Sequence, residues 1–432
     1  MTDAAEKDPV GPITASPEAA AKPDVSSATS KNAAATPSAA PAKKASVTPD
    51  DSPTGSKKAS AEKKRKKPAS GKKKRKKQSG EPVPLTNTPN GDLPAFLKSA
   101  QQPAYRADQV RRWLYRDLTS GFHEMSNLPA ELRKKLAERY TPHGLLPGPI
   151  QQSEDGTHKF LFNTPDGAPV ETVLLPRRRG YALCISSQSG CAMGCPFCAT
   201  GTLGLIRNLT GGEIVDQFLR GRRHARALGS ELESVIFMGM GEPLANMDNL
   251  EQAMGRLVAD DYAGFGARRL TVSTIGLPNR IPRLALWPWQ VGLAISLHTA
   301  DDELRRQLIP ASRVLPLPDL MRDSIAYQQT TSRRVTYEYI LLGEVNDSAD
   351  QARRLATLLQ RQLCHVNLIP YNPVPGLPFV PSVAGRTARF RETLESRGVA
   401  VTVRKPRGRD IGAACGQLAA VGAATLSSNP DR

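Results

Sequence analysis

Three cysteines, Cys191, Cys195 and Cys198, lie close together in a Cys-x3-Cys-x2-Cys pattern. Such a pattern supplies three thiolates to a four-iron cluster and leaves the fourth iron open. An open iron can bind the amino and carboxylate groups of S-adenosylmethionine (SAM) and pass an electron to its sulfonium. The spacing therefore predicts a [4Fe-4S] cluster and radical SAM chemistry.

A structural zinc site is the alternative interpretation of these cysteines. Zinc sites usually close with four Cys or His ligands, commonly arranged as two pairs. The other cysteines, Cys184, Cys364 and Cys415, stand singly, and none of the six histidines pairs at ligand spacing. The spacing thus favours the iron–sulfur cluster over zinc.

The chain of 432 residues carries a net charge of +18, and half of that excess lies in residues 1–90. This segment has 18 Lys plus Arg against nine Asp plus Glu, and no aromatic residue. It cannot bury enough apolar surface to fold, so we expect a disordered Ala/Pro/Ser/Lys-rich tail. Such a tail is either simply solvated or a non-specific RNA tether.

No apolar leader opens the chain, and no run of 18 apolar residues occurs in it. Secretion and membrane spanning are therefore not expected. We expect a cytoplasmic protein with no membrane partner, because a reducing compartment keeps thiols free to act as ligands or nucleophiles.

Residues 91–143 are predicted to form a small basic helical domain. One helical stripe holds Val110, Trp113, Leu114 and Leu118, with Arg111, Arg112 and Arg116 on the opposite face. A second stripe holds Leu132, Leu136 and Tyr140, while Arg133, Lys134 and Lys135 face away. The charged faces are either solvated or bind an RNA backbone.

Residues 144–180 are predicted to form a β-hairpin extension. Strands at 159–162 and 170–175 flank an Asp166-Gly167 turn. Glu171 alternates onto the same side as Val173 and Leu175, an unusual place for a carboxylate unless it is paired or at an edge. Burial would raise its pKa and suit it to accept a proton.

From Tyr181 onward, short apolar strands alternate with helical stretches, which indicates an α/β fold with a parallel sheet or barrel. The expected strands lie around residue 184 and at 235–237, 270–272, 291–296, 335–342, 366–369 and 399–403. Thr210 and Glu213 have capping-box spacing, which predicts a helix start just after the cysteine loop. Polar clusters follow the strands, where βα loops build sites.

From about Leu93 to Leu418 the chain resembles the RlmN family of dual-specificity 23S rRNA and tRNA adenine-C2 methyltransferases. The matching motifs are residues 102–110, 170–173, 184–191, 207–214, 239–244, 338–342, 345–346 and 414–418. Three features depart from the family: Tyr371 where Trp is common, the variant Ser273-Thr-Ile-Gly276, and the basic tail.

The resemblance implies a partial TIM-type (β/α) radical SAM barrel at residues 181–418, followed by a C-terminal tail at 419–432. It implies a [4Fe-4S] cluster held by Cys191, Cys195 and Cys198, and two SAM molecules per turnover. The SAM contacts that it implies are Gly241, Glu242, Ser273, Ser296, Leu297, His298 and Asn372.

The resemblance also implies how three further residues act. Cys415 takes a methyl group from one SAM, and a radical derived from the second SAM activates that methyl for addition to C2 of adenine. Glu171 removes the C2 proton, and Cys184 attacks Cys415 to form a transient disulfide, which an external electron donor reduces. Cys364 has no role in this scheme and is predicted to be a small buried core residue.

The implied partners are 23S rRNA, tRNA and an external electron donor, with a monomer as the expected state. Two alternatives remain open from the residues. One is an adenine-C8 rRNA methyltransferase of the related Cfr type, which uses similarly placed cysteines. The other is a non-catalytic, zinc-stabilised RNA-binding protein.

Overall fold

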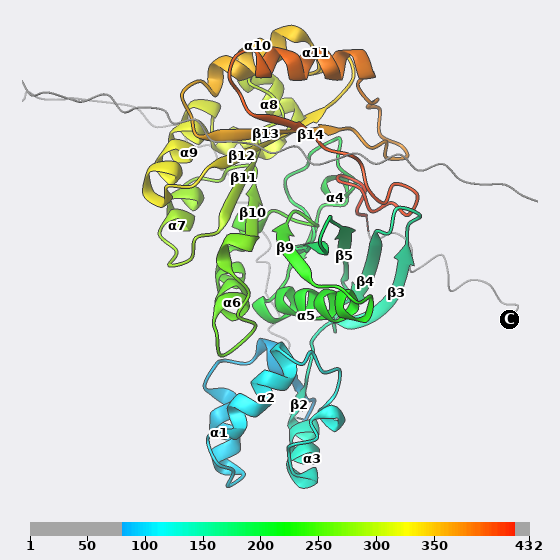
Figure 1. The fold of residues 1–432 in the computed structure, drawn as a ribbon, viewed down its shortest axis with the longest axis vertical. Coiled ribbons are helices and arrows are strands. Elements are labelled where there is room, and N and C mark those ends of the chain that lie inside the picture. The colour runs from blue at the N-terminus through cyan, green and yellow to red at the C-terminus, as the bar shows by residue number, and fades with distance from the viewer. Residues whose placement is uncertain (1–79, 420–432) are drawn as a thin grey trace, which may run out of the picture. The chain divides into compact units, whose positions relative to one another are not determined.

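The computed structural model describes residues 80–419 (Figure 1). The predicted C-terminal tail, apart from Ala419, and most of the predicted N-terminal tail lie outside the described residues.

The main sheet has ten strands in the order β14-β13-β12-β11-β10-β9-β6-β5-β4-β3 (Figure 1). Its parallel part consists of β6 (Tyr181–Cys184), β9 (Leu232–Phe237), β10 (Leu270–Thr274), β11 (Gly292–Ser296), β12 (Val335–Leu341), β13 (Cys364–Pro370) and β14 (Val401–Val403). These strands confirm the predicted βα repetition. In the described part of the chain β3 and β14 do not pair, so the barrel is partial, as predicted.

Helices separate the parallel strands, since neighbouring parallel strands need a crossover connection, which is usually a helix. They are α5 (Gly211–Ala227), α6 (Met247–Val258), α7 (Arg280–Ala285), α8 (Asp302–Leu308), α9 (Leu317–Thr331), α10 (Ala349–Leu358) and α11 (Ala384–Glu395). Alternate side chains of the parallel strands pack with residues of these helices in one apolar core. Val235, Phe237, Val272 and Ile295 are all fully buried in one core.

An antiparallel meander extends the sheet through β3 (Leu146–Gln152), β4 (His158–Asn163) and β5 (Pro169–Pro176). β4 and β5 are the two strands predicted around the Asp166-Gly167 turn. Since β5 also pairs with β6, the meander continues directly into the parallel sheet. The cysteine loop follows between β7 (Gln188–Gly190) and the short helix α4 (Ala199–Thr202).

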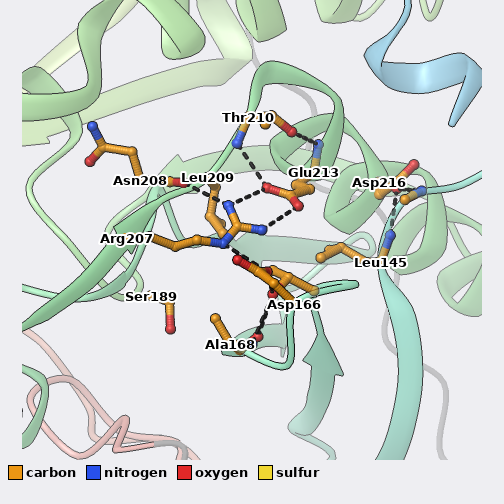
Figure 2. A network of polar contacts seen from close by, with 12 residues as sticks. Leu145, Asp166, Ala168, Ser189, Arg207, Asn208, Leu209, Thr210, Glu213 and Asp216 are labelled. Carbon is orange, nitrogen blue, oxygen red and sulfur yellow. Dashed lines mark hydrogen bonds and ion pairs between the residues drawn. The ribbon is translucent and has the colours of Figure 1, made fainter. Parts of the chain in front are cut away.

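A polar network fixes the chain between the cysteine loop and α5 (Figure 2). Thr210 and Glu213 form the predicted capping box at the start of α5. Arg207, in β8 (Leu205–Asn208), forms a two-point ion pair with Glu213 at 2.5 and 3.0 Å and contacts Asp166 at 3.1 Å. The network therefore joins β8, α5 and the β4–β5 turn. These contacts hold the segment that follows the cysteine loop in a fixed position.

Asp216, also in α5, holds the segment that leads from the helical domain into β3. Its buried carboxylate accepts hydrogen bonds from the backbone N–H groups of Gly144 (2.5 Å) and Leu145 (3.0 Å), and lies 3.0 Å from Nδ1 of His143. A buried carboxylate is tolerated only when donors surround it in this way.

The helical domain contains α1 (Asp92–Ser99), α2 (Arg106–Tyr115) and α3 (Ala130–Arg139), with β1 (Val83–Pro84) paired to β2 (Tyr140–Thr141). The predicted tail boundary at residue 90 is therefore too late. Leu85 and Thr86 are buried, and the guanidinium of Arg256 in α6 donates to the carbonyls of Thr86 and Thr88. A partner 170 residues away orders this segment, and its local composition does not reveal that partner.

Two arginines of the predicted charged face, Arg111 in α2 and Arg116 just after it, contact the barrel. Arg116 donates to the carbonyl of Asp260 at 2.8 Å, and the guanidinium of Arg111 lies over the ring of Tyr262. Arg112 remains exposed, and Lys134 and Lys135 are exposed on α3. Hence only part of the predicted basic surface is available to a ligand. Among the described residues, no helix is long and apolar enough to cross a membrane.

Replacing Asp216 with Ala is expected to destabilise the fold, because three polar groups around it lose their buried acceptor. The expected loss is about 3 kcal/mol in the free energy of unfolding, measured by urea denaturation. Asp248→Ala is the control, since that side chain is 84% exposed and its pair with Arg283 should contribute no more than about 1 kcal/mol. Equal losses in the two variants would contradict this account.

Candidate active site

The three loop cysteines are free thiols, with Cys195 buried and Cys191 and Cys198 half-buried. Burial raises the pKa of Cys191 to about 12 and raises that of Cys195 well above its usual value, and the neighbouring thiolate charges add to both rises. Without a metal these groups therefore stay protonated, and a bound cation would be needed to hold three thiolates side by side in this desolvated loop. This donor set therefore fits an iron–sulfur cluster.

In the described part of the chain, no three Cys, His, Asp or Glu side chains lie close enough to share one metal ion. Each thiolate of a four-iron cluster binds a different iron, so its ligands lie farther apart than those of a single zinc ion.

The cysteine loop packs against the carboxyl ends of several barrel strands. Cys195 and Phe197 share a small apolar cluster with Ile275, Ile340 and Tyr371. The ring of Phe197 also meets that of His298 edge-to-face, with centroids 5.2 Å apart. The loop is thereby placed beside the residues predicted to bind SAM.

Gly241 and Glu242 follow β9 and occupy a tightly packed turn. Gly241 has φ +98°, and a Cβ atom there would lie 2.5 Å from Cβ of Gln188. Gln188 in turn accepts a hydrogen bond from the backbone N–H of Glu242 at 2.8 Å. Only glycine fits this position, so the backbone approaches the site closely.

The carboxylate of Glu242 is buried and links two strand ends. It accepts hydrogen bonds from the backbone N–H groups of Leu244 and Ile275, each at 3.0 Å. Burial nevertheless raises the pKa of Glu242 to about 7, since these hydrogen bonds offset only part of the desolvation. Its carboxylate can therefore gain or lose a proton near neutral pH.

Ser273 and Ser296 lie on neighbouring strands with their hydroxyls 3.5 Å apart. Leu297 has its side chain in the core and its N–H bonded to the carbonyl of Glu338, so any ligand contact from it would come from its own carbonyl.

Burial and the charge of Arg305 lower the pKa of His298 to about 3. Nδ1 of His298 accepts from the N–H of Ile340 at 3.1 Å, so the neutral ring carries its proton on Nε2.

The C-terminal segment carrying Cys415 crosses back onto the cysteine loop. The N–H of Ala199 donates to the carbonyl of Gly416 at 2.8 Å, and the hydroxyl of Thr200 donates to the carbonyl of Leu418. Asn372, a predicted SAM contact, donates to the carbonyl of Cys415 at 3.2 Å. Its amide oxygen accepts from Arg409 at 2.8 Å, so the Asn372 side chain helps to position this segment.

A cavity of about 800 Å³ brings Cys184, Cys198, Cys415 and Asn372 together. Cys184 lies on the same sheet face as Val173, its cross-strand neighbour, which also lines the cavity. The other predicted SAM residues, Gly241, Glu242, Ser273, Ser296, Leu297 and His298, lie at the strand ends outside this lining. Cys364 does not line it either, and at the start of β13 it is half-buried rather than fully buried as predicted.

The thiols of Cys184 and Cys415 affect each other electrostatically. Burial raises the pKa of Cys184 to about 12, and the charge of a Cys415 thiolate contributes to that rise. Desolvation also raises the pKa of Cys415, although this residue is exposed on its loop. Arg404 opposes both rises, and sequence reasoning missed it because no local pattern marks it.

Glu171 is buried and forms an ion pair with Nζ of Lys159 at 3.2 Å. Lys159 is the direct cross-strand neighbour of Val173, so both charged side chains lie on the same sheet face as Cys184. Nζ of Lys159 is 3.6 Å from the position of a Cβ at Gly412, in the Cys415 segment. Glu171 lies outside the cavity lining, one pleat along β5 from Val173.

A partial barrel whose strand ends surround a three-cysteine loop defines a radical SAM enzyme. The model of the Radical SAM superfamily matches residues 185–356. The model described as the ribosomal RNA large subunit methyltransferase N-terminal domain matches residues 83–141.

Proteins of other organisms match over most of this chain. The probable dual-specificity RNA methyltransferase RlmN of Rhodopirellula baltica is 43% identical over 77% of this chain and 90% of its own length. The probable dual-specificity RNA methyltransferase RlmN of Chloroflexus aurantiacus is 46% identical over 76% of this chain and 90% of its own length. The crystal structure of a radical SAM methyltransferase from Sphaerobacter thermophilus has 46% identity and a TM-score of 0.76, covering 78% of this chain and 100% of that one.

The chain belongs to the RlmN family. It is a SAM-dependent RNA methyltransferase, and its cofactors are a [4Fe-4S] cluster and SAM. Family membership favours neither of the alternatives, the adenine-C8 enzyme or the non-catalytic zinc protein.

Replacing Glu242 with Gln is expected to flatten the pH dependence of stability. Its pKa is about 7 in the folded protein against 4.5 in the unfolded chain, so the folded state holds the extra proton between these values. Wild-type stability should therefore fall by about 3 kcal/mol as pH rises through this window, and the variant should lose that component. Urea denaturation of the metal-free proteins over this window measures it, and an identical fall in the variant would contradict the assignment.

Proposed function

We propose that this enzyme methylates C2 of a specific adenosine in 23S rRNA and that tRNA is a second substrate. The relatives named dual-specificity RNA methyltransferase RlmN support this choice, since they match across both the helical domain and the barrel. The observation that carries the proposal is the single cavity lined by Cys184, Cys198 and Cys415.

In this reaction Cys415 is the methyl carrier. Its thiolate attacks the methyl carbon of one SAM, so the sulfur–carbon bond to Cys415 forms as the bond to the sulfonium breaks and S-adenosylhomocysteine leaves. Cys198, a predicted cluster ligand, lines the same cavity, so the methylated sulfur stays near the cofactors. When bound, the cluster and a second SAM supply the electron and the radical that activate the methyl group.

Glu171 and Cys184 then release the product. Glu171 removes the proton from C2, and its position on the same sheet face as Cys184 supports this role. Once the methylene–C2 adduct has also passed its unpaired electron to a redox acceptor, the thiolate of Cys184 attacks the sulfur of Cys415. The disulfide forms as the sulfur–carbon bond breaks, and the methylene carbon takes up a proton to become the methyl group of the product. The electrostatic coupling between these two thiols supports their pairing.

We further propose that the enzyme works in the cytoplasm as a monomer, with an external electron donor that restores both thiols. All six cysteines are free in the structure, which suits a reducing compartment.

Cys415→Ala should abolish product formation. The anaerobically reconstituted protein is incubated with SAM and unmodified 23S rRNA, and 2-methyladenosine is read by mass spectrometry. Cys364→Ala is the control and should retain activity, because that thiol lies outside the cavity. Product in the Cys415 variant would refute the carrier role, and 8-methyladenosine in the wild type would support the C8 alternative.

Cys184→Ala should trap a covalent protein–RNA adduct, because the bond to Cys415 then has no thiol to break it. A denaturing gel detects the adduct as a protein band that nuclease digestion shifts. The Cys184→Ala/Cys415→Ala double variant should form none. Free methylated product in the single variant, without an adduct, would contradict the disulfide step.

A further inference from the structure

The cavity that holds Cys184 and Cys415 has a strongly basic lining. Five cationic side chains line it, and no carboxylate within residues 80–419 does: Arg177, Arg178, Arg404, Lys405 and Arg407. The remaining lining near the sheet is mainly apolar, with Val173, Leu175, Ile236, Met238 and Leu418. The cavity thus combines an apolar wall with a set of cations, which we call the cationic rim.

The cationic rim is built from two segments that lie far apart in the chain. Arg177 and Arg178 lie in the β5–β6 turn, which the hydrogen bond from Arg177 N–H to the Gly180 carbonyl closes at 2.8 Å. Arg404, Lys405 and Arg407 follow β14, at the end of the strand order. Because the sheet curves, the two segments face one cavity.

The arginines of the rim repel one another. Partial desolvation lowers the pKa of Arg177 although its side chain is exposed, and the charges of Arg404 and Arg407 lower it further, while Glu233 opposes them. Among the described residues no ion pair within 4.0 Å includes Arg177 or Arg178; Arg404 has one with Glu338 at 3.5 Å and Arg407 one with Asp155 at 3.9 Å. A bound anion would relieve the repulsion between these cations.

We propose that Arg177 and Arg178 bind backbone phosphates of the RNA on either side of the adenosine whose base enters the cavity. This rests on the proposed function, which requires that base to reach Cys415. Guanidinium groups match phosphate oxygens in a two-point geometry, and the apolar wall suits the face of a base turned out of its stack. The rim therefore positions the nucleotide, while the thiols carry out the chemistry.

The turn itself provides a matched control. Arg179 is the third consecutive arginine of the β5–β6 turn and is exposed like the other two, but it does not line the cavity. Arg177→Gln/Arg178→Gln is compared with Arg179→Gln in the iron-loaded full chain. The probe is an unmodified stem-loop RNA with an unpaired adenosine in its loop, and its affinity is measured by fluorescence anisotropy across a KCl series.

The double variant should bind this RNA roughly tenfold more weakly at low salt, and its salt slope should fall by about 0.7 for each lost phosphate contact. Arg179→Gln should keep most of the wild-type affinity and slope. An unchanged slope in the double variant, with normal iron content, would overturn the proposal. The proposal would also be overturned if Arg179→Gln lost as much affinity per removed charge as the double variant. The effect would then come from the overall positive charge of the turn and not from contacts in the cavity.

Methylation of 23S rRNA is measured separately in the wild type. If the wild type methylates adenosine but the double variant keeps its salt slope, the proposed function stands and the role of Arg177 and Arg178 in phosphate binding is refuted. If the double variant loses salt slope as expected but the wild type forms no methylated adenosine, the proposed function is refuted and the phosphate-binding role stands.

Discussion

The hydrogen bond from the Ala199 N–H to the Gly416 carbonyl connects the two ends of the catalytic barrel. It places Gly416, the residue after the proposed methyl carrier Cys415, against the helix that follows the predicted cluster ligands, more than 200 residues earlier in the chain. The Thr200 hydroxyl, bonded to the carbonyl of Leu418, repeats the contact two residues further on. These bonds help to hold Cys415 in the cavity that Cys184 and Cys198 also line, as the proposed two-thiol chemistry requires.

Hydrogen bonds to the turn between β3 and β4 hold the other end of the Cys415 segment, at residues 408–410. Asp410 accepts from the hydroxyl of Ser153 at 2.6 Å, and Asp155 accepts from the N–H of Gly408 at 3.0 Å. Hydrogen bonds thus hold both ends, while Cys415 between them is exposed. The proposed role of Cys415, which is to receive a methyl group, approach a base and then form a disulfide, needs this combination of a fixed backbone and an accessible sulfur.

Local patterns predicted the strands, the capping box at Thr210 and the cysteine loop, because each depends on neighbours within a few residues. They failed where the deciding partner is distant in sequence. The ordering of residues 83–90 depends on Arg256, and the placement of Arg111 on the barrel depends on Tyr262. Alternation along β5 placed Glu171 correctly beside Val173, but its partner Lys159 follows from the register between two strands, which local periodicity does not give.

The cations around the cavity differ in how firmly they are held, and this difference matches two tasks. Arg404 is half-buried against Glu338, so it faces the thiols without further ordering, although the carboxylate offsets part of its charge. Arg177 and Arg178 are exposed on a turn and have no carboxylate partner within ion-pair distance in the described structure, so they keep their full charge but lose side-chain freedom when they bind. A fixed cation suits a sulfur atom that moves little. Arginine side chains that can change conformation suit an RNA backbone, because they can adjust to the positions of its phosphates on binding.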